Sequence, residues 1–199
     1  MQGESDTVDL TALSPGECRE HLKQLIVNTA LQFGDFTLAS GKQSNYYIDC
    51  RPVVLSGEGA YCLARCIIDL LGEDDIGAVG GMAVGAVPIA GAVAAVAASM
   101  RIEMDAFYVR KEPKGHGMGR QVEGTLSGGT RVAMVEDTVT TGGSTLQAIE
   151  ALKRECDVEI VTVVVMVDRQ EGAAEAFAQA GHDYRAIFTV EDLGVIRNS

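Results

Sequence analysis

The sequence has no tryptophan, only three histidines and a shortage of basic residues. Its 16 lysine and arginine residues are outnumbered by 28 aspartate and glutamate residues, so the formal net charge is −12. Proteins that bind nucleic acid neutralise phosphates with cations, so we expect no nucleic-acid partner. The composition is otherwise typical of a globular protein, with 47% hydrophobic and 22% charged residues.

The sequence also lacks a CxxC motif and long leucine-rich runs. Cys62 and Cys66 would share one face of a helix, which favours core packing over a metal site or a disulfide. Residues 76–100 carry no charge, but their glycines, alanines and Pro88 favour a buried strand and a packed helix over a membrane span. The acidic start, MQGESDTVDL, has no apolar run. We therefore expect no signal peptide and a cytoplasmic protein.

Strand-like and helical stretches alternate along the chain without an interdomain linker. We expect residues 1–199 to form a single domain with an α/β fold, in which helices cover both faces of a parallel sheet. A first helix is predicted from the N-cap Ser14 and Pro15 through to Leu31. The run VVVMV is typical of a central strand that is covered on both faces. The predicted strands are residues 76–81, 103–110, 131–135, 158–167 and 184–190.

The stretch VAMVEDTVTTGGSTLQAIEAL places two acids ahead of a loop of threonines and glycines. Its apolar strand would deliver Glu136 and Asp137 to the carboxyl edge of the sheet, where such folds bind ligands. Residues 138–144 would follow as a loop that opens a helix, and their N–H groups and hydroxyls can surround a phosphate. Ionised carboxylates accept hydrogen bonds from sugar hydroxyls. Acids and loop together predict a site for a sugar phosphate.

A second cluster is basic and lies in YVRKEPKGHGMGRQVEG, residues 108–124. Mobile cations in such a glycine-broken loop could close over a pyrophosphate and stabilise its charge as it leaves. A solvated basic loop is the alternative. The cations are Arg110, Lys111, Lys114, His116 and Arg120.

These motifs resemble a known family. The two acids followed by TVTTGGST resemble the phosphoribosyl-pyrophosphate (PRPP) motif of the type I phosphoribosyltransferases, and RKExKxHG resembles the catalytic loop of orotate phosphoribosyltransferases. Three further segments are similar to that family: FGDFTLASGKQSNYYIDCR to its hood over the base, GGMAVGAVPIA to its pyrophosphate loop, and DRQEGA to its substrate-binding arginine. The resemblance covers residues 33–188. It departs at Ala39 and Val84, where some members carry lysine, and it assigns no role to Lys42.

The resemblance implies a parallel-sheet type I phosphoribosyltransferase fold with a small N-terminal hood, formed mainly by residues 14–51. It implies the reaction of orotate with PRPP to orotidine 5′-monophosphate and pyrophosphate, in pyrimidine (UMP) biosynthesis. The partners implied are orotate, PRPP and a second copy of the chain, in a homodimer with a shared active site. Mg²⁺ would arrive bound to PRPP, with no metal site built by the protein alone.

The resemblance also implies roles for individual residues. The catalytic residues would be Lys111, Lys114, His116 and Asp137. PRPP would be bound by these four together with Arg110, Glu136, Thr138, Val139, Thr140, Thr141, Gly142, Gly143 and Ser144. Orotate would be bound by Thr140 and Arg169, whose planar guanidinium suits a carboxylate.

Two alternatives stay open at this point. A phosphoribosyltransferase for another base would share the acid pair and the phosphate loop, but not the RKEPKGHG loop or Arg169. A PRPP-binding regulator without catalysis would need a DNA-reading element, and the segment before the hood has room for only one helix. The acidic balance also counts against a regulator that binds DNA.

Overall fold

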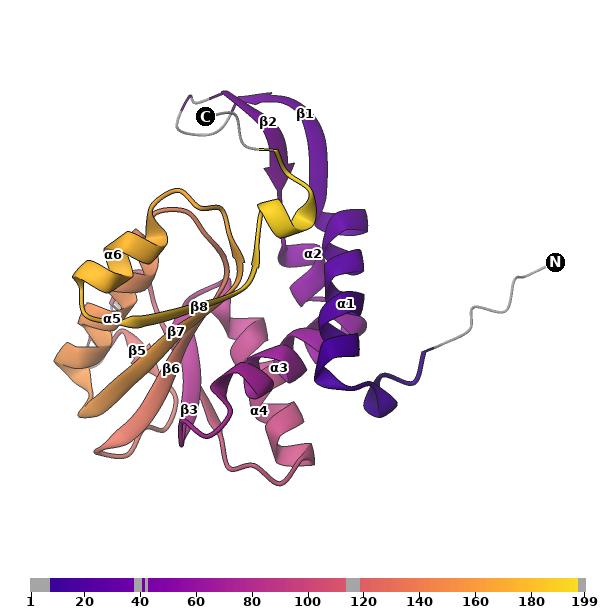
Figure 1. The fold of residues 1–199 in the computed structure, drawn as a ribbon. Helices are drawn as coiled ribbons and strands as arrows, with labels where there is room; N and C mark the ends of the chain where they lie inside the picture. The colour runs from indigo at the N-terminus through magenta and orange to yellow at the C-terminus, as the bar shows by residue number, and fades with distance from the viewer. Residues whose placement is uncertain (1–7, 38–40, 42, 114–118, 197–199) are drawn as a thin grey trace.

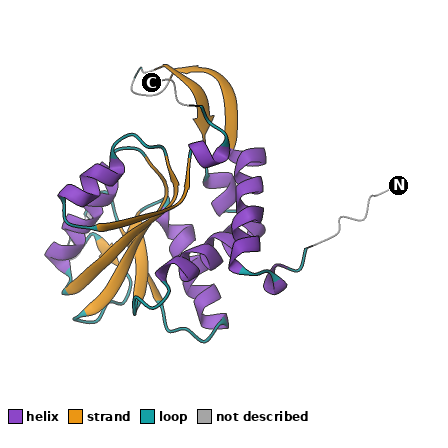
Figure 2. Ribbon diagram, in the orientation of Figure 1, coloured by secondary structure: helices purple, strands orange, loops and turns teal. Residues whose placement is uncertain are grey.

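The computed structural model describes residues 8–37, 41, 43–113 and 119–196. Within them, a six-stranded sheet has the strand order β5-β4-β3-β6-β7-β8 (Figures 1 and 2). The strands are β3 Ala78–Met82, β4 Asp105–Val109, β5 Val122–Glu123, β6 Thr130–Val139, β7 Val158–Asp168 and β8 Asp183–Thr189. All neighbouring pairs are parallel except β5, which runs antiparallel to β4. The predicted α/β sheet is confirmed, with one antiparallel edge strand that the sequence did not reveal.

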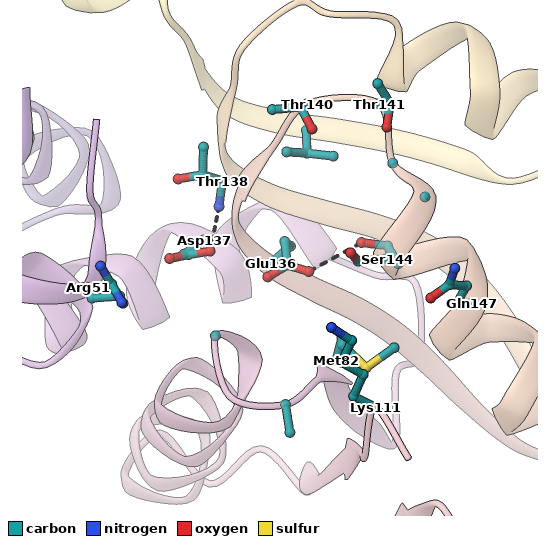
Figure 3. A pocket seen from close by; sticks show the side chains of 16 residues that line it. Arg51, Met82, Lys111, Glu136, Asp137, Thr138, Thr140, Thr141, Ser144 and Gln147 are labelled. Atoms are coloured by element: carbon teal, nitrogen blue, oxygen red, sulfur yellow. Dashed lines mark hydrogen bonds between the residues drawn. The ribbon is translucent and has the colours of Figure 1, made fainter. Parts of the chain in front are cut away.

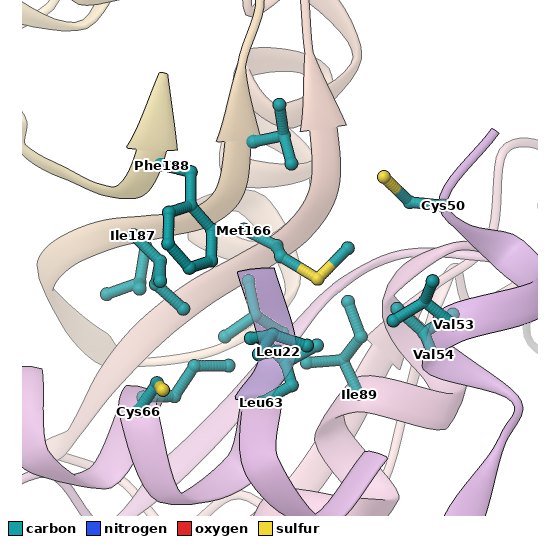
Figure 4. Close-up of a cluster of buried hydrophobic side chains, with 14 of the residues drawn as sticks. Leu22, Cys50, Val53, Val54, Leu63, Cys66, Ile89, Met166, Ile187 and Phe188 are labelled. Atoms are coloured by element: carbon teal, nitrogen blue, oxygen red, sulfur yellow. The ribbon is translucent and has the colours of Figure 1, made fainter. Parts of the chain in front are cut away.

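Helices cover both faces of this sheet, as predicted. They are α1 Pro15–Leu25, α2 Arg51–Val54, α3 Gly57–Leu71, α4 Ala86–Ser99, α5 Gly143–Glu155 and α6 Ala173–Gln179, with 3-10 turns at Leu10–Ala12 and Glu191–Leu193. On one face, Leu22, Leu63 and Ile89 from α1, α3 and α4 pack with Met166 of β7 (Figure 4). On the other face, α5 and α6 pack against Val165. Successive β7 side chains point to opposite faces, which explains the continuous apolar run.

The first helix begins as predicted and ends earlier. The Ser14 hydroxyl accepts a hydrogen bond from the Glu17 N–H at 3.3 Å, and the Ser14 N–H donates to the Glu17 carboxylate at 2.9 Å, which forms a capping box. After α1 the chain makes a π-helical turn at Ile26–Ala30. Leu31 then starts β1 because it pairs with Ile48 in a hairpin. The chain is thus helical through Ala30, one residue short of the predicted end at Leu31, and its last turn is π-helical rather than α-helical.

A hairpin of β1 Leu31–Thr37 and β2 Gln43–Ile48 stands apart from the main sheet, at the top of Figure 1. It overlaps the segment FGDFTLASGKQSNYYIDCR that resembles the hood, although most of the connecting turn, including Ala39 and Lys42, lies outside the described residues. Tyr46 is only 7% exposed and anchors the hairpin to the body of the protein.

The remaining predictions from the sequence concern buried segments. Cys62 and Cys66 lie in α3 and are buried in the core beside Cys18, so their predicted packing role is confirmed. Residues 76–100 form β3 and α4 rather than one long helix. In the described part of the chain, no helix combines the length and apolar character needed to cross a membrane.

Candidate active site

A cavity of about 430 Å³ opens at the carboxyl edge of the sheet (Figure 3). Every residue from Glu136 to Thr145 lines it, so the predicted acid pair and phosphate loop lie together. The β3–α4 connection forms a second wall through Met82, Ala83 and Gly85. Lys111 enters from the end of the β4–β5 hairpin. The cavity therefore brings together acids, an anion-binding loop and a lysine.

The acids lie inside β6 and not after it. The predicted strand ended at Val135, but pairing with β7 continues to Val139, opposite Asp168. The loop is therefore shorter than predicted, since α5 already begins at Gly143. Gly142 precedes α5 with a φ of +79°, and a Cβ there would lie 2.9 Å from the Phe177 ring. Only glycine fits this turn, which aims the N-terminus of α5 at the cavity.

Glu136 and Asp137 are held by hydrogen bonds in a largely buried position. The Thr145 hydroxyl donates to the Glu136 carboxyl at 3.3 Å, and the Thr138 N–H donates to Asp137 at 2.8 Å. Gly85 approaches so closely that a Cβ would lie 3.0 Å from Glu136 Oε1. The missing side chain at Gly85 thus lets the β3–α4 connection close over the acids.

The pair does not carry two full charges near neutral pH. Burial, together with the charge of Asp137, raises the pKa of Glu136 to about 8. Burial also raises the pKa of Asp137. A proton retained on the pair reduces its repulsion of an approaching phosphate. Two acids can therefore lie beside an anion-binding loop.

The predicted basic residues are only partly within the described structure. Lys111 lines the cavity, whereas Arg110 does not and faces Glu123 across the hairpin at 3.6 Å. Lys114 and His116 lie outside the described residues. The hairpin itself was not predicted, and it places Lys111 where the chain leaves the sheet.

Arg169 follows β7, as predicted, but the cavity lining does not include it. Its Nε donates to the Tyr46 hydroxyl at 3.1 Å, and its terminal nitrogen lies 3.0 Å from Glu171. The side chain is only 13% exposed, so the ion pair is not a surface one. Arg169 therefore joins the hood to the sheet edge, while Thr140 lines the cavity itself.

Six lining residues were not named individually from the sequence. Met82, Ala83 and Gly85 lie in the segment GGMAVGAVPIA that resembles the pyrophosphate loop, and Thr145 ends the TVTTGGST motif. Arg51 and Gln147 were missed as cavity residues. Gln147 lies one helical turn after Gly143, so helical periodicity could have found it. Arg51 ends the hood segment and is held by Asp49 through two hydrogen bonds of 2.7 and 2.6 Å. Nothing local in the sequence signals that Arg51 reaches the cavity, because α2 must first fold against the core.

The mainly parallel sheet, the hood and a cavity lined by an acid pair and a TTGGS loop define a type I phosphoribosyltransferase. In agreement, the family model described as phosphoribosyl transferase domain matches residues 63–182. Within this class the chain belongs to the orotate phosphoribosyltransferases, on the following comparisons. These enzymes are pentosyltransferases of pyrimidine biosynthesis, which transfer the ribose 5-phosphate group of PRPP to orotate.

Both sequence and structure relatives carry that name. The orotate phosphoribosyltransferase of Rhodopirellula baltica is 46% identical over 177 residues, which are 86% of this chain and 91% of the relative. A crystal structure of the Mycobacterium tuberculosis enzyme is 38% identical with a TM-score of 0.78, covering 89% of this chain and 99% of the other. A structure of that enzyme in complex with PRPP is 34% identical with a TM-score of 0.74, with the same coverage. These relatives favour the orotate enzyme over the two alternatives.

Proposed function

We propose that orotate phosphoribosyl transfer takes place in the cavity between the β3–α4 connection and the start of α5. The observation that carries this proposal is that the acid pair, the loop at the N-terminus of α5 and Lys111 line the same cavity. Residues 138–144 would hold the 5′-phosphate of PRPP through backbone N–H groups and hydroxyls. Glu136 and Asp137 would accept hydrogen bonds from the ribose hydroxyls. The Mycobacterium tuberculosis relative crystallised with PRPP supports this assignment of the ligand.

The reaction breaks the bond between the anomeric carbon and the pyrophosphate oxygen as an orotate nitrogen attacks that carbon. Positive charge develops on the ribose ring, as in glycoside cleavage. Glu136 and Asp137 would stabilise it, with Asp137 as the catalytic carboxylate. Negative charge moves onto the leaving pyrophosphate, where Lys111 would be the first cation to meet it. Arg110, Lys114 and His116 would complete this cationic group.

Orotate would lie between the hood and the sheet edge. Thr140 lines the cavity, and Arg169 is held against Tyr46 of the hood. The Arg169 guanidinium now faces the carboxylate of Glu171. Because orotate is itself a planar carboxylate, it could take a similar position on the guanidinium.

Mg²⁺ fits this site as a companion of PRPP. Among the described residues, the cavity offers two carboxylates to a cation, those of Glu136 and Asp137. Mg²⁺ prefers six oxygen ligands, so phosphate and water oxygens would supply most of them. The ion would neutralise phosphate charge and help the pyrophosphate to leave.

A homodimer with a shared active site is the assembly that we propose. In support, Leu55 is 71% exposed and Val84 is 81% exposed, and they lie in the chain near the cavity residues Arg51 and Gly85. Large exposed apolar side chains beside a site favour a protein contact. A cytoplasmic location is supported by the five cysteines, which are all free.

The direct test is the absorbance change of orotate after PRPP and Mg²⁺ are added to pure protein. We expect orotate consumption that needs all three components, with no turnover of adenine, guanine or uracil. Binding of PRPP without orotate turnover would keep the phosphate site and reject the proposed acceptor.

The acid pair also predicts how stability depends on pH. The pKa of Glu136 is raised from 4.5 to about 8 in the folded protein, so the folded state holds an extra proton between these values. The free energy of unfolding must then fall as pH rises through this window. We expect the ligand-free protein to melt at a lower temperature at about pH 8.5 than at about pH 7. Thermal unfolding of Glu136→Gln should show a smaller decrease, and equal decreases in both proteins would contradict the assignment.

A further inference from the structure

The root of the basic loop, where the two ends of the loop meet, is hydrogen-bonded to the C-terminal end of α5. The first turn of this helix lines the phosphate site. Strand β4 ends just before that loop and strand β5 begins just after it. β5 has only two residues and lies at the edge of the sheet, so few ladder hydrogen bonds hold it. A second source of hydrogen bonds is therefore needed to fix this strand.

Glu155, the last residue of α5, supplies those hydrogen bonds. Its Oε2 accepts from the Gln121 N–H at 2.9 Å and from the Val122 N–H at 3.2 Å. The Glu155 side chain is 18% exposed. One carboxylate oxygen thus holds two adjacent backbone donors of the strand that returns from the loop, and hydrogen bonds to a charged acceptor are the stronger kind.

The side chain of Gln121 reaches the opposite side of the loop. Its Nε2 donates to the Arg110 carbonyl at 3.0 Å, and the Arg110 N–H donates to the Gln121 carbonyl at 2.8 Å. Arg154 completes the cluster by donating to Gln121 Oε1 at 2.5 Å. Hydrogen bonds therefore hold both strands that flank the basic loop at the C-terminal end of α5. Lys111 is the next residue in the chain after this hydrogen-bonded cluster.

α5 connects this point to the phosphate loop. Gly143 and Ser144 at its first turn line the cavity, and Glu155 at its last turn holds the loop root. Ala148, Ile149 and Leu152 are buried against the sheet along the helix, so α5 cannot shift easily. A helix packed in this way keeps the two sites at a constant separation.

We propose that Glu155 and Gln121 are positioning residues, which fix the root of the basic loop so that Lys111 meets the leaving pyrophosphate. This inference rests on the role of Lys111 in the proposed function. Neither residue lines the cavity, so each acts through the loop and not on the substrate. A small displacement of a catalytic group lowers turnover more than substrate binding, which gives the inference a kinetic signature.

The test compares Glu155→Ala with Glu150→Ala, an exposed glutamate on the same helix. For Glu155→Ala we expect kcat to fall by about 10- to 100-fold with an unchanged KM for orotate, while the lost hydrogen bonds lower the melting temperature by only a few degrees. Glu155→Gln keeps a side-chain oxygen as acceptor and should recover most of the turnover. Gln121→Ala, which leaves the backbone donors in place, should lower kcat in the same direction. Glu150→Ala should behave as the unmodified protein.

A double variant separates this inference from the proposed function. If Glu155 acts through Lys111, adding Glu155→Ala to Lys111→Ala should cause little further loss. Losses that multiply would show that Glu155 acts elsewhere and would overturn the inference alone. Near-normal turnover in Glu155→Ala beside a severe loss in Lys111→Ala would do the same. Near-normal turnover in Lys111→Ala by itself would instead reject the proposed role of the loop.

Discussion

Lys111→Ala is expected to lower kcat by about 10²- to 10³-fold while the protein stays folded. Lys111 lines the same cavity as the acid pair. In the proposed function its ammonium stabilises the charge that develops on pyrophosphate. The residue is exposed, so its truncation removes no core contact. Steady-state orotate consumption at saturating PRPP measures the loss, and circular dichroism checks the fold.

Lys153→Ala is the matched control, because Lys153 is an exposed lysine on α5 that does not line the cavity. It should retain full turnover. A Lys111→Ala variant as active as this control would remove Lys111 from the mechanism. A rise in KM with unchanged kcat would show instead that Lys111 binds substrate and transition state equally.

Mixing inactive variants shows which subunit Lys111 serves. Lys111→Ala and Asp137→Ala should each be nearly inactive. If the basic loop serves the partner's cavity in a homodimer, half of the randomly mixed dimers carry one intact site, and about a quarter of full activity should return. No recovery would mean that Lys111 serves the cavity of its own chain, which it lines here.

The sequence predicted the features that depend on neighbouring residues. The N-cap at Ser14, the buried strand at residues 163–167 and the loop at the start of α5 each follow from local patterns of polarity and turn chemistry. The joint presence of Glu136 to Ser144 at one cavity also follows, because a strand, loop and helix in succession must place them together.

The features that it did not predict depend on long-range contacts. β5 has too few residues to show a periodic pattern, and it exists because Tyr108 and Val109 offer it a partner. Arg51 reaches the cavity only after α2 has packed. The end of β6 was placed too early because acids rarely lie in buried strands, yet Glu136 pairs opposite Val165 in β7. In the proposed function the acids bind the ribose, which explains that exception.

That exception leads to the second prediction, which concerns a double variant that carries both Glu136→Gln and Asp137→Asn. Each amide keeps the shape and an oxygen acceptor, but loses the charge. Hydrogen bonds to charged groups contribute about 1.5–3 kcal/mol each, and the pair, which keeps one proton near neutral pH, offers the ribose one full charge. Its loss should lower kcat/KM by about 10- to 100-fold. The same double variant should be more stable than the unmodified protein without ligand, because burial raises both pKa values and the charge of Asp137 raises that of Glu136 further.

The gain in stability has a predicted pH dependence. At about pH 8.5 the Glu136 carboxyl has lost the proton that it keeps at lower pH, so the buried repulsion is largest there. We expect the double variant to melt about 2–8 °C above the unmodified protein at that pH, and the difference to shrink toward about pH 6. Differential scanning calorimetry without PRPP measures both values. Glu150→Gln, which changes an exposed charge on α5, should alter neither activity nor melting temperature appreciably.

Together, kcat/KM and the melting temperature of the double variant show whether the two acids serve the ligand or the fold. If the acids served mainly to hold Thr138 and Thr145 in place, the double variant would lose activity and stability together. A loss of activity with a gain in stability would mean that the two partly buried acids destabilise the empty protein and are retained because they bind the sugar. Such opposite changes are expected where a site is built for its ligand and not for the empty fold. Unchanged kcat/KM in the double variant would refute the role of the pair in binding ribose.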